Sequence, residues 1–320
     1  MISRSPLVFV VVIAVTFSAC LNKAETSTQV PAATVASPQA SASVPAPQPG
    51  ADAELAARLK AICERAGGRC GVAVTHVETG RSAAFEGDTP LPLYSVFKLP
   101  LAVAVLKEVE EGRLQIDQKV RVEPEEAAPG VKSNSDLWLK ASDRTIRELL
   151  EFSIVRSDNT SSDKMLELVG GPEAVTRRMR ALGLQNIEVR ATVKEFLKSE
   201  GREAHPNTGA ASDLARLLVL LQKGEVLAPP QLEVLLGFMG RVLTGDRRLR
   251  AGPPKGTPVA DKTGTGPSTT NDVGIVTLPG DKGHLALAVL LDGSKLPAEK
   301  QEDLIAEVAR AAYDAHVAGK

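Results

Sequence analysis

Apolar side chains recur along this chain with two different periods, and each period predicts a different kind of structure. Between residues 141 and 239 they return every three to four positions, as they do on one face of an amphipathic helix. Proline stands in the first turn of two of these stretches, where its missing N–H is tolerated. The pattern predicts an all-helical lobe with helices at residues 143–152, 159–169, 172–182, 212–223 and 230–239.

A period of two marks the segments that flank this lobe. Alternating, β-branched stretches separated by turn residues predict strands at residues 70–77, 81–85, 273–278 and 285–291. Both ends of the folded region again show a helical period, at residues 55–66 and 301–316. We therefore expect an α/β (α+β) fold, in which an antiparallel sheet flanked by both terminal helices carries the helical lobe as an insertion. A pocket is expected in the cleft between the two lobes.

One further helix is expected to begin at Ser95 and to end at Gly112, and its apolar positions have the spacing of a core helix. Pro100 lies in its second turn and must remove one backbone hydrogen bond. Ser95 and Lys98 are three residues apart, which puts both side chains on one face. A serine hydroxyl is a weak nucleophile that needs a base within reach, and a lysine can provide one. Ser95 is therefore the candidate nucleophile and Lys98 its first partner.

The first 50 residues differ from the rest of the chain. Arg4 precedes the short apolar run 7–15, which is typical of a secretory signal and too short to span a bilayer. Phe17-Ser18-Ala19-Cys20 is similar to a lipobox, in which Cys20 is lipidated; ordinary signal cleavage is the alternative. Residues 20–50 are poor in large apolar side chains and favour a disordered tether. We therefore expect a signal peptide at 1–19, a lipidated tether at 20–50 and a catalytic domain at 51–320, anchored to a membrane and facing the periplasm or the cell exterior.

Composition narrows the class of partner. The formal net charge is −1, so no basic field would attract nucleic acid, and a small molecule is the expected partner of a monomeric protein. Cys63 and Cys70 are seven residues apart and form either a disulfide or two buried thiols. We expect no metal and no cofactor, because the four histidines lack the spacing of a zinc site: His76, His205, His284 and His316.

Two further motifs give Ser95 its significance, since S-x-x-K also occurs at Ser161. Ser157-Asp158-Asn159 follows Ser95, and Lys262-Thr263-Gly264 follows that. The order S-x-x-K, S-D-N, K-T-G is a signature of serine acyl transferases, and Ser161 cannot lead it because it follows S-D-N. From about residue 53 to the C-terminus, the chain resembles the class A serine β-lactamases and, more distantly, the penicillin-binding proteins.

The resemblance implies a role for each residue of the second motif. Ser157 would pass a proton to the departing nitrogen, and Asn159 would bind the acylamino side chain of the substrate. Lys98 would take the proton of Ser95 directly or through a water, and it must be neutral to do so. Burial and the charge of Lys262 are expected to lower its pKa. Taken alone, the motif is also suited to capping the helix that starts at Asn159.

The third motif is expected at the edge of a strand. Lys262 and Thr263 would hold the substrate carboxylate, and Gly264 would keep the edge open for the ligand. The backbone N–H groups of Ser95 and Thr265 would form the oxyanion hole, by resemblance. Taken alone, this sequence is merely a turn.

The chain departs from the family at the group that activates water for release of the acyl group. Class A enzymes use a glutamate in an E-x-x-L-N pattern, which is missing here. The expected position falls near Val193, and Glu195 is the candidate base; a solvated side chain between two lysines is the alternative. The next candidates are Glu188, Glu200 and Glu203.

The sequence therefore predicts a serine β-lactamase that opens the β-lactam amide through an acyl-enzyme on Ser95. Two alternatives stay open. One is a penicillin-binding protein or D-alanyl-D-alanine peptidase, and the other is a β-lactam receptor that is acylated once and does not turn over.

Overall fold

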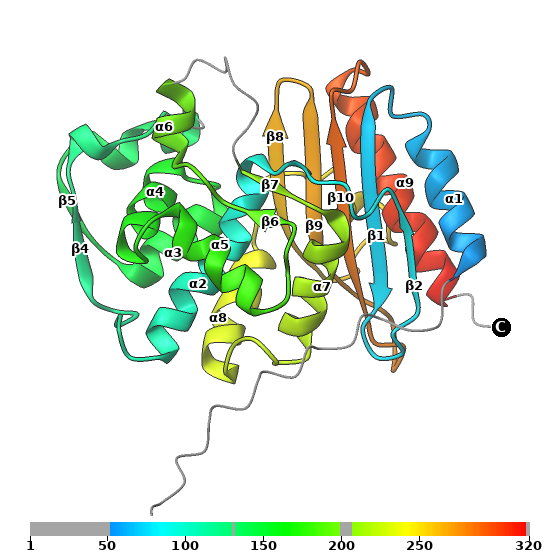
Figure 1. Ribbon diagram of the computed structural model, residues 1–320, viewed down its shortest axis with the longest axis horizontal. Coiled ribbons are helices and arrows are strands. Elements are labelled where there is room, and N and C mark those ends of the chain that lie inside the picture. Colours follow the sequence, from blue (N-terminus) through cyan, green and yellow to red (C-terminus); the bar gives the residue numbers. More distant parts are fainter. Residues whose placement is uncertain (1–51, 130–131, 199–206, 318–320) are drawn as a thin grey trace, which may run out of the picture. The chain divides into compact units, whose positions relative to one another are not determined.

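An antiparallel sheet of five strands forms the α/β lobe, in the order β2-β1-β10-β9-β8 (Figure 1). Its strands are β1 (Arg69–His76), β2 (Ser82–Phe85), β8 (Val259–Gly266), β9 (Thr269–Thr277) and β10 (His284–Asp292). The predicted hairpin and the two late strands are confirmed.

The computed structural model describes residues 52–129, 132–198 and 207–317. The predicted signal peptide, Cys20, the tether, Glu200 and Glu203 lie outside the described residues.

The two terminal helices cover one face of this sheet, as predicted. Helices α1 (Ala53–Cys63) and α9 (Ala298–Val317) pack against each other and against the sheet (Figure 1). Apolar side chains from both helices and from β1 and β10 form one buried cluster, which includes Leu59, Val74, Leu287 and Ile305. Helix α7 (Ala211–Gln222) contacts β1, β9 and β10 and belongs to the second buried cluster, on the other side of the sheet. The sheet is thus buried between two layers of helix.

Helix α2 (Lys98–Glu110) runs through the helical lobe, and every side chain from Lys98 to Leu106 is buried. A helix that is buried all round must be surrounded by other elements. The helices that contact α2 are α3 (Ile146–Val155), α4 (Asn159–Leu168), α5 (Pro172–Ala181) and α8 (Pro229–Met239). The predicted helical lobe is therefore confirmed, with α2 as its central element, although the lobe also contains short strands.

The start of α2 differs from the prediction. Residues Tyr94–Phe97 form a 3₁₀ turn, and the α-helix begins only at Lys98. Pro100 consequently lies in the first helical turn rather than the second. Backbone N–H groups of a first turn have no partner within the helix, so the proline removes no intrahelical bond there.

Short strands that the apolar pattern did not predict complete the helical lobe. Three of them form a small sheet in the order β3-β7-β6, with β3 at Leu91–Pro92, β6 at Ile187–Glu188 and β7 at Thr208–Gly209. Strands β4 (Lys119–Val122) and β5 (Ser142–Thr145) pair with each other. Strand β5 is polar throughout and occupies the first residues of the helix predicted at 143–152, so α3 begins later than expected.

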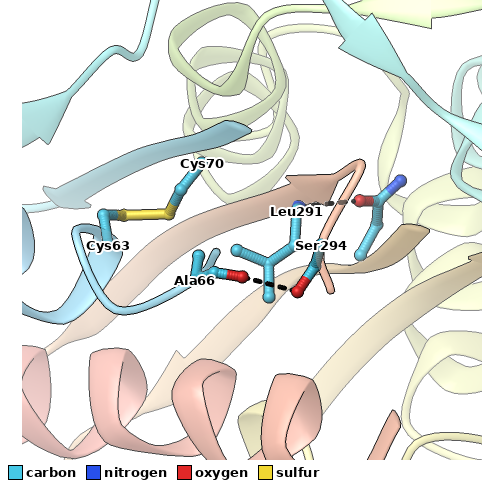
Figure 2. Close-up of a disulfide and its surroundings, with 6 residues drawn as sticks. Cys63, Ala66, Cys70, Leu291 and Ser294 are labelled. Carbon is cyan, nitrogen blue, oxygen red and sulfur yellow. Dashed lines mark hydrogen bonds between the residues drawn. A yellow bond between two sulfur atoms is a disulfide. The ribbon is translucent and has the colours of Figure 1, made fainter. Parts of the chain in front are cut away.

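A disulfide joins Cys63 at the end of α1 to Cys70 in β1, with an S–S distance of 2.01 Å (Figure 2). Of the two alternatives for these cysteines, the structure therefore has the disulfide. In the loop that it closes, the Ala66 carbonyl accepts a hydrogen bond from the Ser294 hydroxyl, as Figure 2 shows. Among the described residues, no helix combines the length and the apolar character needed to cross a bilayer.

Candidate active site

The nucleophile candidate Ser95 lies in the 3₁₀ turn that leads into α2. In a 3₁₀ turn, side chains three residues apart lie on the same side, so Ser95 and the first residue of α2, Lys98, keep their predicted relation. Ser95 is partly exposed, whereas Lys98 is fully buried. Tyr94, directly before Ser95, has a φ of +46°, a backbone conformation that costs energy for a residue with a side chain. The chain is therefore forced into a sharp bend at the nucleophile.

The second motif lies in the loop before α4 and combines both predicted uses. Asp158 is the N-cap, and its Oδ1 accepts hydrogen bonds from the Ser161 N–H (2.7 Å) and hydroxyl (2.6 Å). The indole N–H of the buried Trp138 also donates to this carboxylate, at 3.2 Å. Because Asp158 does the capping, the side chains of Ser157 and Asn159 are available to the site. The hydroxyl of the other S-x-x-K serine, Ser161, is buried and committed to this cap.

All three motifs meet at the Ser157 hydroxyl. Lys98 Nζ donates to the Ser157 carbonyl (2.6 Å) and to Asn159 Oδ1 (2.7 Å), and lies 3.4 Å from Ser157 Oγ. The Lys262 ammonium donates to the same Oγ at 3.1 Å from the opposite element, strand β8. Ser157 itself has a φ of +54°, again unusual for a residue with a side chain. A hydroxyl between the Nζ atoms of two lysines can pass a proton from one side of the site to the other.

The two lysines have different electrostatic surroundings. Burial, and then the positive charge of Lys262, hold the pKa of Lys98 well below its usual value, in agreement with the prediction. Burial also lowers the pKa of Lys262, to about 8, but the negative charges of Asp261 and Asp272 oppose this shift. Lys98 is consequently suited to accept a proton, whereas Lys262 is mostly charged at neutral pH.

Strand β8 carries the third motif past the 3₁₀ turn that holds Ser95. A Cβ at Gly264 would lie 2.3 Å from the Leu93 carbonyl oxygen and 3.2 Å from the Val96 nitrogen. Glycine is thus required because two segments of backbone approach each other, and the predicted reason, room for a ligand, is not the one that the contacts give. Thr263 Oγ1 shares a 2.6 Å hydrogen bond with the Thr244 hydroxyl.

The sequence analysis missed Arg248, which precedes a short 3₁₀ turn at Leu249–Ala251. Its guanidinium is buried and donates to the Gly264 carbonyl (3.2 Å), the Asn271 carbonyl (3.0 Å) and Thr265 Oγ1 (2.8 Å). This arginine therefore brings a permanent positive charge to the strand that carries Lys262. No spacing in the sequence relates it to the three motifs.

In the structure, Glu195 is bonded to the start of its own helix. Its Oε2 accepts hydrogen bonds from the Thr192 N–H (2.8 Å) and hydroxyl (2.9 Å), which is a capping box at the start of α6 (Val193–Lys198). The side chain is exposed, and among the described residues no hydrogen bond joins it to Ser95 or Lys98. Glu188, the next candidate, pairs with Arg180 and Arg190. The geometry therefore favours the alternative, a glutamate at the surface.

A different carboxylate, Asp163, lies between this segment and Lys98. Asp163 is one turn after Asn159 on α4, and it accepts hydrogen bonds from the backbone N–H groups of Val193 (2.7 Å) and Lys194 (2.9 Å). Burial raises its pKa, although these two bonds and the nearby Lys98 oppose the shift. Asp163 thus fixes the start of α6 and adds negative charge close to Lys98.

Comparisons with known proteins agree with this arrangement. The model of the Beta-lactamase enzyme family matches residues 54–316. The β-lactamase VEB-1 of Pseudomonas aeruginosa is 27% identical over 81% of this chain and 89% of its own, and the extended-spectrum β-lactamase PER-1 of the same organism is 32% identical over 69% and 74%.

Solved structures show the same likeness. The crystal structure of a β-lactamase from Chitinophaga pinensis has a TM-score of 0.78 and 31% identity, and covers 82% of this chain and 99% of its own. That of the TLA-3 extended-spectrum β-lactamase has a TM-score of 0.77 and 28% identity, over 82% and 98%.

Proposed function

This chain belongs to the β-lactamase enzyme family and is a class A β-lactamase hydrolase, and we propose that its residues Ser95, Lys98, Ser157 and Lys262 carry the reaction. The observation that supports this assignment most is the position of the Ser157 hydroxyl, within hydrogen-bond distance of both lysines. Three sequence motifs from different elements are thereby joined in one buried chain of hydrogen bonds.

Acylation begins when Ser95 Oγ attacks the β-lactam carbonyl carbon and gives its proton to neutral Lys98, directly or through a water. The C–N bond of the ring then breaks, and the proton passes from Lys98 by way of Ser157 Oγ to the departing nitrogen. The backbone N–H groups of Ser95 and Thr265 stabilise the oxyanion of the tetrahedral intermediate. Lys98 is neutral again at the end of this sequence.

Substrate binding uses the other side of the site. The carboxylate that β-lactams carry next to the ring nitrogen is held by Lys262, the hydroxyl of Thr263 and the charge of Arg248. Asn159 keeps the predicted role toward the acylamino group. Its Oδ1 accepts a hydrogen bond from Lys98, and its Nδ2 donates to the Pro129 carbonyl at 2.6 Å. No described glutamate is hydrogen-bonded to Ser95 or Lys98, so the neutral amine of Lys98 is the base that this arrangement offers to the deacylating water.

The placement of Glu195 also favours a second candidate function. If neutral Lys98 does not activate the water that releases the acyl group, a family member whose loop glutamate caps a helix has no base for release, and it would accumulate the acyl-enzyme. Such a protein would act as a β-lactam receptor that is acylated once.

Chromogenic cephalosporin hydrolysis separates these candidates. We expect turnover that continues for many equivalents of substrate. A burst of one equivalent that then stops would instead identify the receptor, and release of D-alanine from a cell-wall peptide, without hydrolysis of the cephalosporin, would identify a peptidase.

We further propose that the protein is a monomeric, exported lipoprotein with Cys20 as the modified N-terminus. The support is the lipobox-like Phe17-Ser18-Ala19-Cys20 after a short apolar run. Intact mass of the membrane-extracted protein should show a diacylglycerol on Cys20, and Cys20→Ser should move the protein to the soluble fraction. A mature chain that begins at another residue would contradict this proposal.

A further inference from the structure

Two histidine rings are stacked where strand β1 meets the end of helix α9. His76 is the last residue of β1, and His316 lies in the last turn of α9. Their rings are nearly parallel, with an interplanar angle of 8° and centroids 5.2 Å apart. His76 is buried and His316 is half-buried. Because side chains alternate along a strand, His76 continues the face of β1 on which Val72 and Val74 pack against the terminal helices. The stacked pair thus joins the end of α9 to the sheet.

The hydrogen bonds of both rings are those of neutral imidazoles. A carbonyl oxygen can only accept, so His76 Nε2 carries a proton, which it donates to the Lys282 carbonyl at 2.7 Å. His76 Nδ1 then accepts hydrogen bonds from the Thr79 N–H (3.2 Å) and hydroxyl (2.9 Å). By the same argument, His316 Nδ1 donates to the Ala312 carbonyl at 2.8 Å. Among the described residues, His316 Nε2 is buried and has no hydrogen-bond partner.

A second proton would disturb the arrangement of either ring. On His76 it would be at Nδ1, and the hydrogen bond from the Thr79 N–H would be lost because two donors cannot bond to each other. On His316 it would be at Nε2, which is buried without an acceptor among the described residues. Two protonated rings would also repel each other across the stack. Burial accordingly lowers the pKa of His316, although its hydrogen bond to the Ala312 carbonyl opposes the shift.

The charges that face His316 compensate each other. Asp52 is the N-cap of α1, and Arg81 comes from the turn between β1 and β2. The aspartate favours a proton on His316, whereas the arginine and His76 disfavour it. Asp52 and Arg81 form an ion pair at 2.6 Å, so a charged His316 would have no counterion of its own.

One carboxylate faces His76, and it is shared with another histidine. Glu78 lies 3.8 Å from His76 Nδ1. The same carboxylate accepts a hydrogen bond from the backbone N–H of His284 on β10 at 2.8 Å, and it lies 2.7 Å from His284 Nδ1. The turn between β9 and β10 contributes the Lys282 carbonyl described above. Five elements therefore meet at the pair: the start of α1, both turns, β10 and the end of α9.

We propose that the His76–His316 pair is a pH-sensitive latch, which holds the last turn of α9 on the sheet while both rings are neutral and releases it when they are protonated. The latch goes beyond the proposed function of the site and does not depend on it. Since the pKa of His316 is lower in the folded chain than its usual value of about 6.5, the pair stabilises the fold above that pH. This stabilisation is lost as the pH falls through the lowered pKa of His316.

Hydrogen exchange followed by mass spectrometry tests the latch in the full chain. After correction for the intrinsic pH dependence of exchange, amides of residues 313–317 should exchange about tenfold faster or more at about pH 5 than at about pH 7.5. Amides of the buried helix α2 should change by less than about twofold. Equal protection of the last turn at both pH values would overturn the proposal. An equal loss of protection in α2 would mean that acid unfolds the whole domain, and would contradict a local latch.

His316→Phe is the decisive variant, because phenylalanine keeps a ring for stacking but has no group to protonate. Its last turn should stay protected at both pH values. His284→Gln is the matched control, since it removes the neighbouring histidine and leaves the stacked pair, and it should respond to pH as the wild type does. A response to pH that survives in His316→Phe, or that disappears in His284→Gln, would contradict the latch.

NMR titration of the histidine rings tests the latch in the wild-type protein, and so applies even if His316→Phe does not fold. The His316 ring should titrate below its usual pKa of about 6.5, over the pH range in which the last turn loses protection. A His316 ring that titrates above about 6.5, or a turn that opens in a different pH range, would overturn the proposal.

Discussion

Two regions next to Ser95 are held in different ways. The motif cluster, which we define as Lys98, Ser157, Asn159 and Lys262, is built from the starts of α2 and α4, the loop before α4 and the edge strand β8. The second region is the loop segment, residues 190–198. Its Phe196 ring packs edge-on against Tyr94, the residue before Ser95, with ring centroids 6.3 Å apart. In the cluster, each lysine hydrogen-bonds to another motif; in the loop segment, the only glutamate caps its own helix. The groups for acylation are thus held by contacts between motifs, whereas the loop glutamate is held by the start of its own helix.

The largest expected effect is at the nucleophile. Ser95→Ala should lower kcat by about 10⁶-fold and abolish acylation, because loss of a covalent nucleophile leaves only binding and oxyanion stabilisation. A fluorescent penicillin, followed by gel and peptide mapping, measures this directly. Ser161→Ala is the matched control, since it removes the serine of the other S-x-x-K, and it should keep the acylation rate within a few-fold. Equal labelling of Ser95→Ala and wild type would contradict the assignment of Ser95 as the nucleophile.

Lys98→Arg tests whether acylation needs a base at position 98 or only a positive charge. Arginine keeps the positive charge but cannot give up a proton, so acylation should slow by about 10²- to 10⁴-fold. In the wild type, the acylation rate should fall as pH drops below the lowered pKa of Lys98, because the amine is then protonated. Stopped-flow acylation across pH measures both. Near-normal acylation by the Lys98→Arg variant would mean that Lys98 acts electrostatically.

The disulfide lies away from both regions and tests the scaffold alone. Cys63→Ser/Cys70→Ser should lower the free energy of unfolding by about 2–3 kcal/mol, the value expected for a short closed loop. Chemical denaturation gives this value, and kcat/KM at 25 °C should stay within about twofold of wild type. A large loss of kcat/KM in the folded variant would show that the cluster depends on this distant link.

Lys262→Arg separates substrate binding from the proton relay. Because the pKa of Lys262 is about 8, the wild-type kcat/KM should fall by about tenfold per pH unit above that value as the ammonium is lost. Arginine stays charged, so the alkaline limb should disappear even if the peak value is lower. A pH profile from 6 to about 10 records this. If the alkaline limb is unchanged in Lys262→Arg, a group other than Lys262 causes it.

The smallest effect is expected in the loop segment. Glutamine at position 195 can still accept the hydrogen bonds from Thr192, so Glu195→Gln should clear the acyl-enzyme within a few-fold of the wild-type rate. Mass spectrometry after mixing with a penicillin follows the adduct. If the variant instead traps the adduct while the wild type clears it, Glu195 is the base and the loop must rearrange on substrate binding.

Apolar periodicity predicts the two lobes, because the buried faces of helices and strands repeat locally along the chain. The order of the three motifs predicts the motif cluster. The start of α3 was misplaced, although the sequence held the signal. Thr145-x-x-Glu148 is a capping box, and the structure uses it as one. The same pattern, Thr192-x-x-Glu195, predicts that the Glu195 carboxylate accepts a hydrogen bond from the backbone at the start of its own helix. The position of Glu195 in the loop, from which it was chosen as the candidate base, does not show this.

Other parts of the site had no sequence signal. Arg248 and Asp272 join the site only because a turn and a neighbouring strand bring them under β8, and neither has a fixed spacing to a motif. Strand β5 is polar throughout, so apolar alternation does not mark it, and its partner β4 alternates over four residues only. Long-range pairing of this kind follows from the assembled fold and not from local sequence.

The central claim is that Ser95 forms an acyl-enzyme that turns over. Its most direct test is a quenched time course of the wild-type protein with excess penicillin, read by intact mass and by peptide mapping. We expect an early adduct on the peptide that contains Ser95, followed by return to the unmodified mass once the penicillin is hydrolysed. An adduct on any other residue would contradict the site, and an adduct on Ser95 that persists for hours would contradict the turnover.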